Sequence, residues 1–475
     1  MKRPELLLPA GNLEKMRSAF AFGADAVYAG SPRYSLRMRN NEFQHEELAQ
    51  GIEEAHVLGK QFYVTANILP HNDKVKTFIR DMAPLIAMKP DALIMADPGL
   101  ISLVREEWPE VPVHLSVQAN TMNFASVKFW HKLGIPRIIL SRELRIDELE
   151  EIKQLVPEME IEVFVHGSLC IAYSGRCLLS GYFNHRDSNQ GNCSNACRWN
   201  YKVEGASESD AVAGSAGGCG CSSGSGDSSG SSCSTSSRAT GTIDSETLMG
   251  GSAGFGNAHV PRHPLADEPW FIEEKSRPGQ KMPVFEDEHG TYIMNSKDLR
   301  AIEHVQQLME IGIDSFKIEG RTKSRFYVAR TAQAYRRAID DAMAGKTFDQ
   351  SLLGDLDRVA SRGYTDGFFS RKGADETQNY DTDRALADTK YSGDVISYDS
   401  ARGTAVVQVK NLIRVGDVIE IVHPTGNFLT RVPSIHTLDG KSLSQAPGDG
   451  WTVMIPCEKD LTGGMVAVTQ EALTK

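Results

Sequence analysis

Short apolar segments alternate with amphipathic helical segments through the first 345 residues of this chain. Most of the apolar segments are followed by a stretch with helical spacing of apolar residues, as at 46–58, 75–87 and 146–155. Alternation of strand and helix is typical of parallel β-structure. Eight segments have the length and composition of buried strands: residues 5–8, 26–29, 62–66, 92–96, 113–117, 138–140, 161–165 and 315–318.

Eight strand–helix units predict an α/β fold, a (β/α)8 TIM-like barrel that carries one long insertion. A doubly wound parallel sheet is the alternative that periodicity alone leaves open. Asn12 stands directly before the first helical segment and is a suitable N-cap. The barrel is expected to occupy residues 1–345, because the last strand–helix unit ends there.

The rest of the chain divides into three further parts. From Gly214 to Ser237, 18 of 24 residues are Gly or Ser. Such a tract buries too little apolar surface to offset the entropy lost on ordering, so residues 205–258 are predicted to be a flexible surface insertion. Residues 346–389 have the pattern of a helical connector. Residues 390–475 hold short β-branched runs divided by Gly/Pro turns, which predicts a small C-terminal all-β barrel domain.

The composition restricts the partners of the protein. A formal net charge of −11 argues against nonspecific coating of nucleic acid, which depends on neutralising phosphates, so no DNA partner is expected. No stretch approaches the roughly 20 apolar residues of a membrane span, and the first residues lack the apolar core of a signal peptide. We therefore expect a cytoplasmic protein without a membrane partner.

One local cluster of basic residues could still bind RNA. Six basic side chains lie within 17 residues: Arg321, Lys323, Arg325, Arg330, Arg336 and Arg337. Such a cluster is the kind of patch that an acidic RNA-binding protein needs. A solvated helix face is the alternative.

Four cysteines lie close together after the seventh strand segment: Cys170, Cys177, Cys193 and Cys197, spaced C-x6-C-x15-C-x3-C. Reduced cytoplasmic thiols favour a metal over disulfides. Four thiolates can hold zinc or an iron–sulfur cluster, and the spacing leaves both open, because only the last pair fits a zinc knuckle. The insertion adds Cys219, Cys221 and Cys233, any of which is an alternative to Cys197 as the fourth ligand.

Polar residues occupy the ends of the predicted strands, where the active sites of such barrels lie. Gln118, Arg142, His166 and Glu319 are the candidate catalytic residues, and Asn67 is a candidate substrate-binding residue. His166 could act as an acid or base near neutral pH. A structural histidine is the alternative for this position.

Several long motifs resemble one known protein family. The segment from Glu162 to Ser180 resembles the signature of the collagenase-like peptidases, a family of unclassified peptidases, and so does the start of the chain from Pro4 to Gly30. Shorter matching motifs are Tyr34-Ser-Leu-Arg-Met-Arg-Asn-Asn-Glu-Phe43, Leu115-Ser-Val-Gln-Ala-Asn120, Ile139-Leu-Ser-Arg-Glu-Leu144, Asn295-Ser-Lys-Asp-Leu299 and Lys317-Ile-Glu-Gly-Arg321.

The resemblance implies a specific activity. Within the family, the most similar members hydroxylate the wobble uridine of the tRNA anticodon to 5-hydroxyuridine. The resemblance thus implies an oxygen-independent tRNA modification enzyme with an iron–sulfur cluster of the 4Fe–4S type, for which prephenate is the hydroxyl donor. Other relatives hydroxylate a ribosomal RNA cytidine or a ubiquinone precursor, and these remain alternatives, as does the peptidase activity in the family name.

A dicarboxylate donor such as prephenate calls for arginine, whose guanidinium holds a carboxylate by two parallel hydrogen bonds. Arg37, Arg39 and Arg321 lie in the resembling motifs and are candidate substrate-binding residues, although each could instead bind tRNA phosphate. A peptidase would need Cys170 and His166 as nucleophile and base, which leaves the other three cysteines without a role. The chain has no His-Glu-x-x-His motif of a metallopeptidase.

Overall fold

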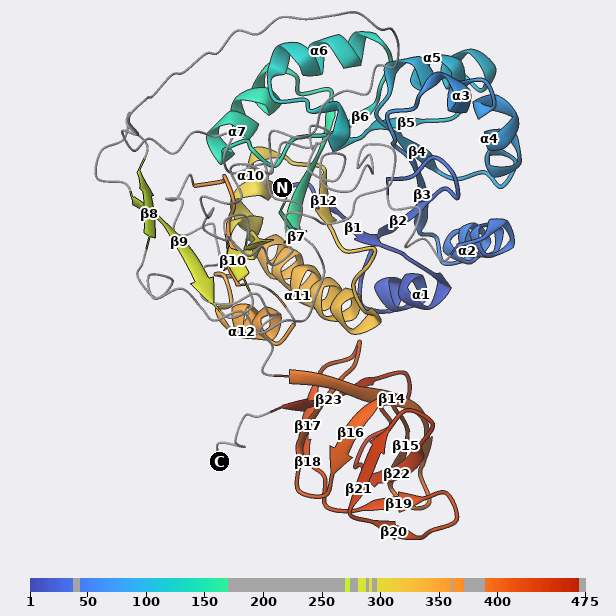
Figure 1. Cartoon of the computed structure of the whole chain (residues 1–475), viewed down its shortest axis with the longest axis vertical. Helices are drawn as coiled ribbons and strands as arrows, with labels where there is room; N and C mark the ends of the chain where they lie inside the picture. The colour runs from blue at the N-terminus through green and yellow to red at the C-terminus, as the bar shows by residue number, and fades with distance from the viewer. Residues whose placement is uncertain are drawn as a thin grey trace, which may run out of the picture. The chain divides into compact units, whose positions relative to one another are not determined.

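The eight predicted strands form one closed parallel sheet in the computed structural model, so the TIM-like barrel is confirmed and the doubly wound sheet is excluded (Figure 1). Neighbouring strands pair in chain order, and β12 pairs with both β1 and β7, which closes the barrel. The strands are β1 Glu5–Pro9, β2 Ala26–Gly30, β3 Gln61–Ala66, β4 Ala92–Met95, β5 Val113–Leu115, β6 Arg137–Ile139, β7 Glu160–Ser168 and β12 Ser315–Ile318.

The structure describes residues 1–36, 43–169, 270–273, 281–287, 290–292, 297–359, 361, 363–370 and 389–469. The predicted insertion at 205–258 lies outside these residues. Residues Asn200–Tyr292 belong to a second unit of the chain. Its described part is an antiparallel sheet of β8 Trp270–Glu273, β9 Lys281–Asp287 and β10 Gly290–Tyr292.

A layer of helices surrounds the barrel sheet. Asn12 caps the first of them as predicted, because its side chain accepts a hydrogen bond from the Lys15 N–H at 2.9 Å. The inward face of the second helix includes three buried residues, Leu48, Ile52 and Ala55. The helices are α1 Leu13–Ala21, α2 His45–Val57, α3 Asn72–Val75, α4 Phe78–Ile86, α5 Pro98–Glu107, α6 Phe124–Lys132, α7 Ile146–Leu155, α10 Val305–Ile311 and α11 Arg325–Met343.

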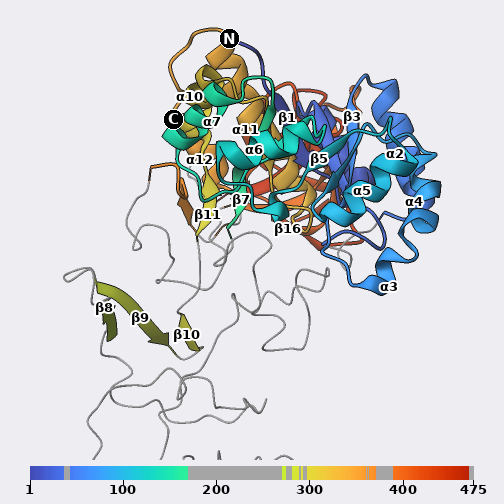
Figure 2. The same ribbon diagram turned by 90° about the horizontal axis from the view of Figure 1, so that it is seen from above.

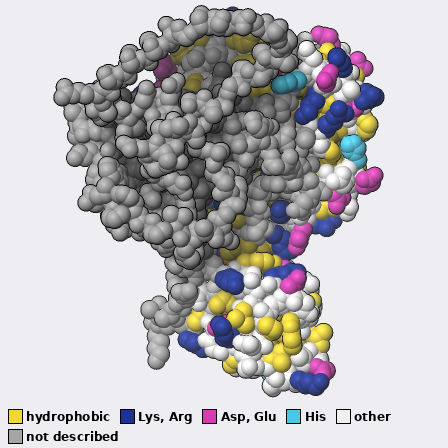
Figure 3. Space-filling view, in the orientation of Figure 1, with side chains coloured by type: hydrophobic (Ala, Val, Ile, Leu, Met, Phe, Trp, Pro, Cys, Tyr) yellow, Lys and Arg dark blue, Asp and Glu magenta, His cyan; other side chains and the backbone are white. Residues whose placement is uncertain are grey.

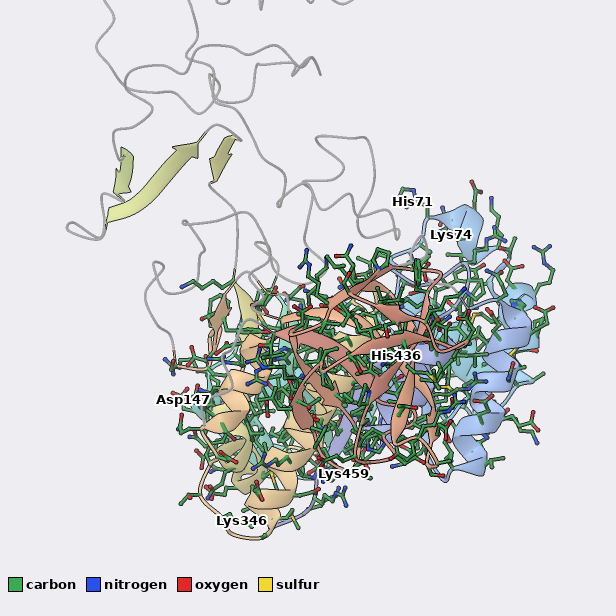
Figure 4. All side chains as sticks on the ribbon, turned by 90° about the horizontal axis from the view of Figure 1, so that it is seen from below. His71, Lys74, Asp147, Lys346, His436 and Lys459 are labelled. Atoms are coloured by element: carbon green, nitrogen blue, oxygen red, sulfur yellow. The ribbon has the colours of Figure 1, made fainter. Side chains whose placement is uncertain are left out.

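The loops that follow the strands and those that follow the helices lie at opposite ends of the barrel. His71 and Lys74 follow β3 and lie at one end, whereas Lys346 follows α11 and lies at the other (Figure 4). The first of these ends is where the carboxyl ends of all eight strands meet, so it is the end that can carry an active site.

Strand β7 has neighbours that an ideal barrel lacks. β11 Asp298–Arg300 pairs antiparallel with its end, and β13 Tyr364–Thr365 pairs with β11 (Figure 2). The pairing of β7 with β12 also shifts register, because Lys317 lies opposite Phe164 while the next residue, Ile318, lies opposite His166. One extra residue, Val165, therefore forms a bulge in β7, and a bulge changes the side to which the following side chain points.

The C-terminal region is an antiparallel β half-barrel, as its alternation of β-branched runs and turns predicts. Its core contains Val407, Ile419, Ile435 and Val453, all at most 1% exposed. In the chain, α12 Ser351–Asp357 lies between α11 and this region, and η6 Ile302–His304 directly precedes α10. The strands are β14 Thr389–Asp399, β15 Thr404–Val409, β16 Asn411–Arg414, β17 Val418–Val422, β18 Phe428–Arg431, β19 Ile435–Thr437, β20 Ser442–Leu443, β21 Gln445–Gly448, β22 Thr452–Pro456 and β23 Met465–Thr469.

Among the described residues, no helix has the length and apolar character needed to cross a lipid bilayer.

Candidate active site

A cavity of about 110 Å³ lies at the carboxyl ends of the barrel strands. Its lining combines polar side chains with a few apolar walls, which is the usual composition of a small-molecule site. Three cationic side chains and one carboxylate belong to it, so the described lining favours an anionic ligand. The lining residues are Tyr28, Leu36, Thr65, Asn67, Ile94, Ser116, Val117, Gln118, Ile139, Arg142, Phe164, Ser168, Lys317, Glu319 and Arg321.

Five of the predicted site residues meet at this cavity: Asn67, Gln118, Arg142, Glu319 and Arg321. They come from chain segments up to 254 residues apart and share only the position at or just beyond a strand end. The geometry of the closed barrel brings them together, because all parallel strands end on the same side. Two other residues that follow strands, Gly11 and Asp97, are not part of the described lining. Asp97 instead caps α5, because its side chain accepts a hydrogen bond from the Leu100 N–H at 2.9 Å.

Hydrogen bonds to a neighbouring strand and to neighbouring loops hold Arg321 and Asn67 in place. The Nη1 atom of Arg321 donates to Ser35 Oγ at 2.6 Å and to Thr65 Oγ1 at 3.0 Å, and the residue is 8% exposed. Asn67 donates from Nδ2 to Ser116 Oγ at 3.2 Å. These contacts fix the two side chains before any ligand arrives.

Arg142 is held by a ring rather than by an ion pair. Its guanidinium carbon lies 3.8 Å from the centroid of the Phe164 ring, a cation–π contact. Within the part of the chain that the structure describes, no carboxylate forms a salt bridge with it. Arg142 is therefore the cavity cation best placed to bind an incoming carboxylate.

Glu319 approaches the end of β7 closely. Its Oε2 accepts from the backbone N–H of Ser168 at 3.2 Å. The contact depends on Gly167, which has a φ of +113° and where an added Cβ would lie 2.6 Å from the Glu319 backbone oxygen. No other residue type fits this position without moving Glu319.

The sequence reasoning missed two lining residues that carry charge or aromatic surface, Lys317 and Phe164. Both lie inside their strands rather than at the ends. The period of two along a strand could have found Lys317, because Lys317 and Glu319 share one side of the chain and Ile318 points the other way.

His166 lies outside the cavity lining, although it was predicted to be catalytic. The bulge at Val165 turns it away from the barrel interior, and its ring packs 5.5 Å from the ring of Tyr335 and 5.3 Å from that of Tyr364. Its Nδ1 is 3.3 Å from Tyr335 Oη, and the residue is 1% exposed. This position favours the structural alternative for His166.

Burial also changes the protonation of His166. Removal from water lowers its pKa from 6.5 to about 3, an effect that the nearby Asp298 carboxylate opposes only in part. His166 is therefore neutral at physiological pH and a poor general acid there.

Five of the six residues of the basic cluster at 321–337 pair with acidic side chains. Arg325 pairs with Glu14 at 2.6 Å, Arg336 pairs with Asp340 at 2.9 Å, and Lys323 pairs with Asp298 at 3.6 Å. Arg330 is buried and pairs with Glu420 of the half-barrel, and Arg337 pairs with Asp349. Figure 3 shows basic side chains interspersed with acidic ones on the described part of the visible face as well. The cluster is thus not the open basic patch that RNA would need.

Six predicted site residues lie outside the described residues: Arg37, Arg39, Cys170, Cys177, Cys193 and Cys197. Their roles stay predictions. Among the residues that the structure does describe, no three His, Cys, Asp or Glu side chains are grouped to bind a metal ion.

Comparison with known families agrees with this fold and with the motifs. The profile of peptidase family U32 matches residues 11–379, and that of the U32 C-terminal domain matches residues 387–467. The chain belongs to peptidase family U32. The second profile covers the β half-barrel, so both parts of the molecule are typical of U32 proteins.

Two U32 relatives are similar over nearly their whole length. The chain is 53% identical over 461 residues to tRNA hydroxylation protein P of Escherichia coli (strain K12), covering 97% of this chain and 95% of the relative. It is 50% identical to tRNA hydroxylation protein P of Haemophilus influenzae, covering 97% and 94%. A 23S rRNA 5-hydroxycytidine synthase of Escherichia coli is 27% identical, covering 90% of this chain and 52% of the relative.

Proposed function

We propose that this protein hydroxylates tRNA, converting the wobble uridine of the anticodon to 5-hydroxyuridine without molecular oxygen. The observation that carries the proposal is the near full-length similarity, 53% and 50%, to two proteins named for tRNA hydroxylation. The ribosomal RNA alternative has weaker support, because that relative is 27% identical and twice as long as the matched region.

The cavity suits a small carboxylate donor, for which prephenate is the candidate. Arg142 can bind one carboxylate with its guanidinium, which has no ion-pair partner among the described residues, and Arg321 presents a second fixed cation. Gln118 and Asn67 supply amide groups that can orient the ligand or the edge of a uracil base. The base would have to leave the anticodon stack to reach this site, as in other enzymes that modify single nucleotides.

An iron–sulfur cluster is the proposed cofactor, held by Cys170, Cys177 and Cys193 with Cys197 or a cysteine of the insertion as the fourth ligand. Their spacing and the family resemblance support it. Such a cluster would supply redox or Lewis-acid chemistry. Anaerobic purification should give near-stoichiometric iron and acid-labile sulfide, which Ala substitutions at these three cysteines abolish. Zinc, or no metal, would contradict the cofactor.

Peptidase activity, which the family name suggests, has less support. Ser116 and Ser168 line the cavity, but a serine nucleophile needs a base that takes its proton, and none of the described lining residues is histidine or cysteine. Lys317, the lysine of the described lining, donates a hydrogen bond to Glu162. His166 faces Tyr335 instead.

The test is a comparison of tRNA nucleosides. An Escherichia coli strain that lacks its own tRNA hydroxylation protein P is grown anaerobically, so that an oxygen-dependent route cannot contribute. Expression of this chain should restore nucleosides derived from 5-hydroxyuridine in tRNA and leave ribosomal RNA cytidines unchanged. Restoration in ribosomal RNA alone would overturn the proposal.

A further inference from the structure

Directly beneath the cavity, the barrel interior is charged, whereas barrels of this kind are usually filled by branched apolar side chains. Lys317 on β12 is 3% exposed and Glu162 on β7 is 0% exposed. Glu5 and Arg137 lie farther from the cavity and pair with each other at 2.6 Å. Of these four residues, only Lys317 lines the cavity.

Glu162 holds the Lys317 ammonium on one side. The Nζ atom of Lys317 donates to Glu162 Oε1 at 2.7 Å. It also lies 4.4 Å from the centroid of the Tyr28 ring and 5.6 Å from that of Phe164, and both rings line the cavity. The ammonium therefore sits between its carboxylate partner and the cavity walls.

The Lys317 ammonium has hydrogen-bonding capacity left over. An ammonium carries three N–H donors, and within the described residues Glu162 receives the one hydrogen bond that Lys317 donates. A buried donor without an acceptor is costly, as is a buried ion pair that merely fills space. An oxygen of a ligand in the cavity would satisfy these donors.

The other charges of the lining indicate what kind of ligand this is. Arg142 and Arg321 add two cations, and Glu319 adds one carboxylate. Burial lowers the pKa of Lys317, while Glu162 opposes that shift and favours the charged form. An anionic ligand would favour the charged form further, because it adds negative charge beside the ammonium.

We propose that Lys317 is a ligand-contacting residue of this site: its remaining donors hydrogen-bond a carboxylate or carbonyl oxygen of the small organic acid that Arg142 binds, and Glu162 positions the ammonium. This inference rests on the proposed function in one respect, because it takes the cavity to be the binding site of the donor. The inference adds Lys317 to the ligand-binding residues that lie at the strand ends.

The test uses prephenate as the probe and isothermal titration calorimetry on the anaerobically purified full chain. Lys317→Met alone would take the hydrogen-bond donor away from Glu162, which is 0% exposed and lies 3.6 Å from Arg137, and the variant could fail to fold for that reason. The variant to compare is therefore Lys317→Met with Glu162→Gln, which removes both charges of the pair together. The matched control is Glu162→Gln alone, which keeps the ammonium.

We expect the double variant to melt within a few degrees of wild type and to bind prephenate at least tenfold more weakly. Glu162→Gln should lose less affinity for prephenate than the double variant does. Binding by the double variant within twofold of wild type would overturn the role of Lys317 and leave the proposed function standing. Absence of prephenate binding to wild type would instead contradict the proposed donor itself.

A second measurement needs no variant. Reductive methylation of wild type, followed by peptide mass spectrometry, reports how accessible Lys317 is through the cavity. Saturating prephenate should lower its labelling severalfold and leave Lys441, whose side chain is 80% exposed, unchanged. Labelling of Lys317 that does not change with prephenate would overturn the inference.

Discussion

The arginines of α11 and Arg142 of the cavity are the same residue type in opposite surroundings. Arg325, Arg330, Arg336 and Arg337 each face at least one carboxylate. Arg142 lies over the ring of Phe164 instead and has no ion-pair partner among the described residues. The number of basic residues in a segment therefore says little about binding. What matters is whether the fold supplies a partner, because a paired guanidinium holds the protein together and an unpaired one can bind a ligand.

The largest effect is expected at Arg330. Replacing it by Met leaves Glu420, whose side chain is 4% exposed, with Arg358 at 2.8 Å as its remaining ion-pair partner among the described residues. Loss of one partner of a buried pair costs about 3 kcal/mol of the free energy of unfolding. Urea unfolding followed by circular dichroism measures this. The double change with Glu420→Gln should recover most of the loss, and a single-variant loss under about 1 kcal/mol would contradict the structural role.

A smaller effect, on activity rather than stability, is expected at Arg142. Arg142→Gln should lower the rate of tRNA hydroxylation about 100-fold, which is about 2.7 kcal/mol of activation free energy, because the proposed donor would lose the cation that binds its carboxylate. The free energy of unfolding should stay within about 1 kcal/mol of wild type. Rates come from mass spectrometry of tRNA nucleosides. Equal loss of stability and activity would mean that Arg142 is structural.

The buried histidine predicts a pH effect. The pKa of His166 is about 3 in the folded protein and about 6.5 when unfolded, so below pH 6.5 the unfolded chain binds the extra proton. Stability should therefore fall as the pH drops from 6.5 toward 3, by about 2 kcal/mol between pH 7 and pH 5 from this group alone. His166→Phe should lose that part of the pH dependence. An unchanged profile in the variant would contradict the assignment.

The smallest effect is expected at Arg337, the matched control for Arg142. Its side chain is 53% exposed and its partners lie on the surface. Such pairs contribute about 0.5 kcal/mol or less. Arg337→Gln should leave both unfolding and tRNA hydroxylation near wild type. A large loss of tRNA binding in this variant would mean that α11 does contact RNA.

The barrel could be predicted from the sequence because each strand and helix carries its own local pattern. All eight strand segments and the Asn12 cap were found this way, and five polar strand ends do meet at one cavity. Position along the strand is enough to predict that these residues lie at the cavity, since the closed sheet aligns all strand ends.

The features that the sequence did not reveal depend on contacts between distant residues. The bulge at Val165 turns His166 to the opposite side of the strand from the one that regular alternation predicts. No local sequence pattern predicts a bulge of one residue. Several acidic partners of Arg325 and Arg330 lie 69 or more residues away from them, namely Asp394, Glu14 and Glu420. The predicted roles of the four cysteines and of Arg37 and Arg39 remain predictions.

One measurement tests the central claim, that the cavity lined by Arg142 is the site of tRNA hydroxylation. In the anaerobic Escherichia coli strain that lacks tRNA hydroxylation protein P, wild type, Arg142→Gln and Arg337→Gln are expressed at equal levels, and 5-hydroxyuridine-derived nucleosides in tRNA are quantified. We predict full restoration by wild type and Arg337→Gln and almost none by Arg142→Gln. Equal restoration by all three would show that the reaction takes place elsewhere.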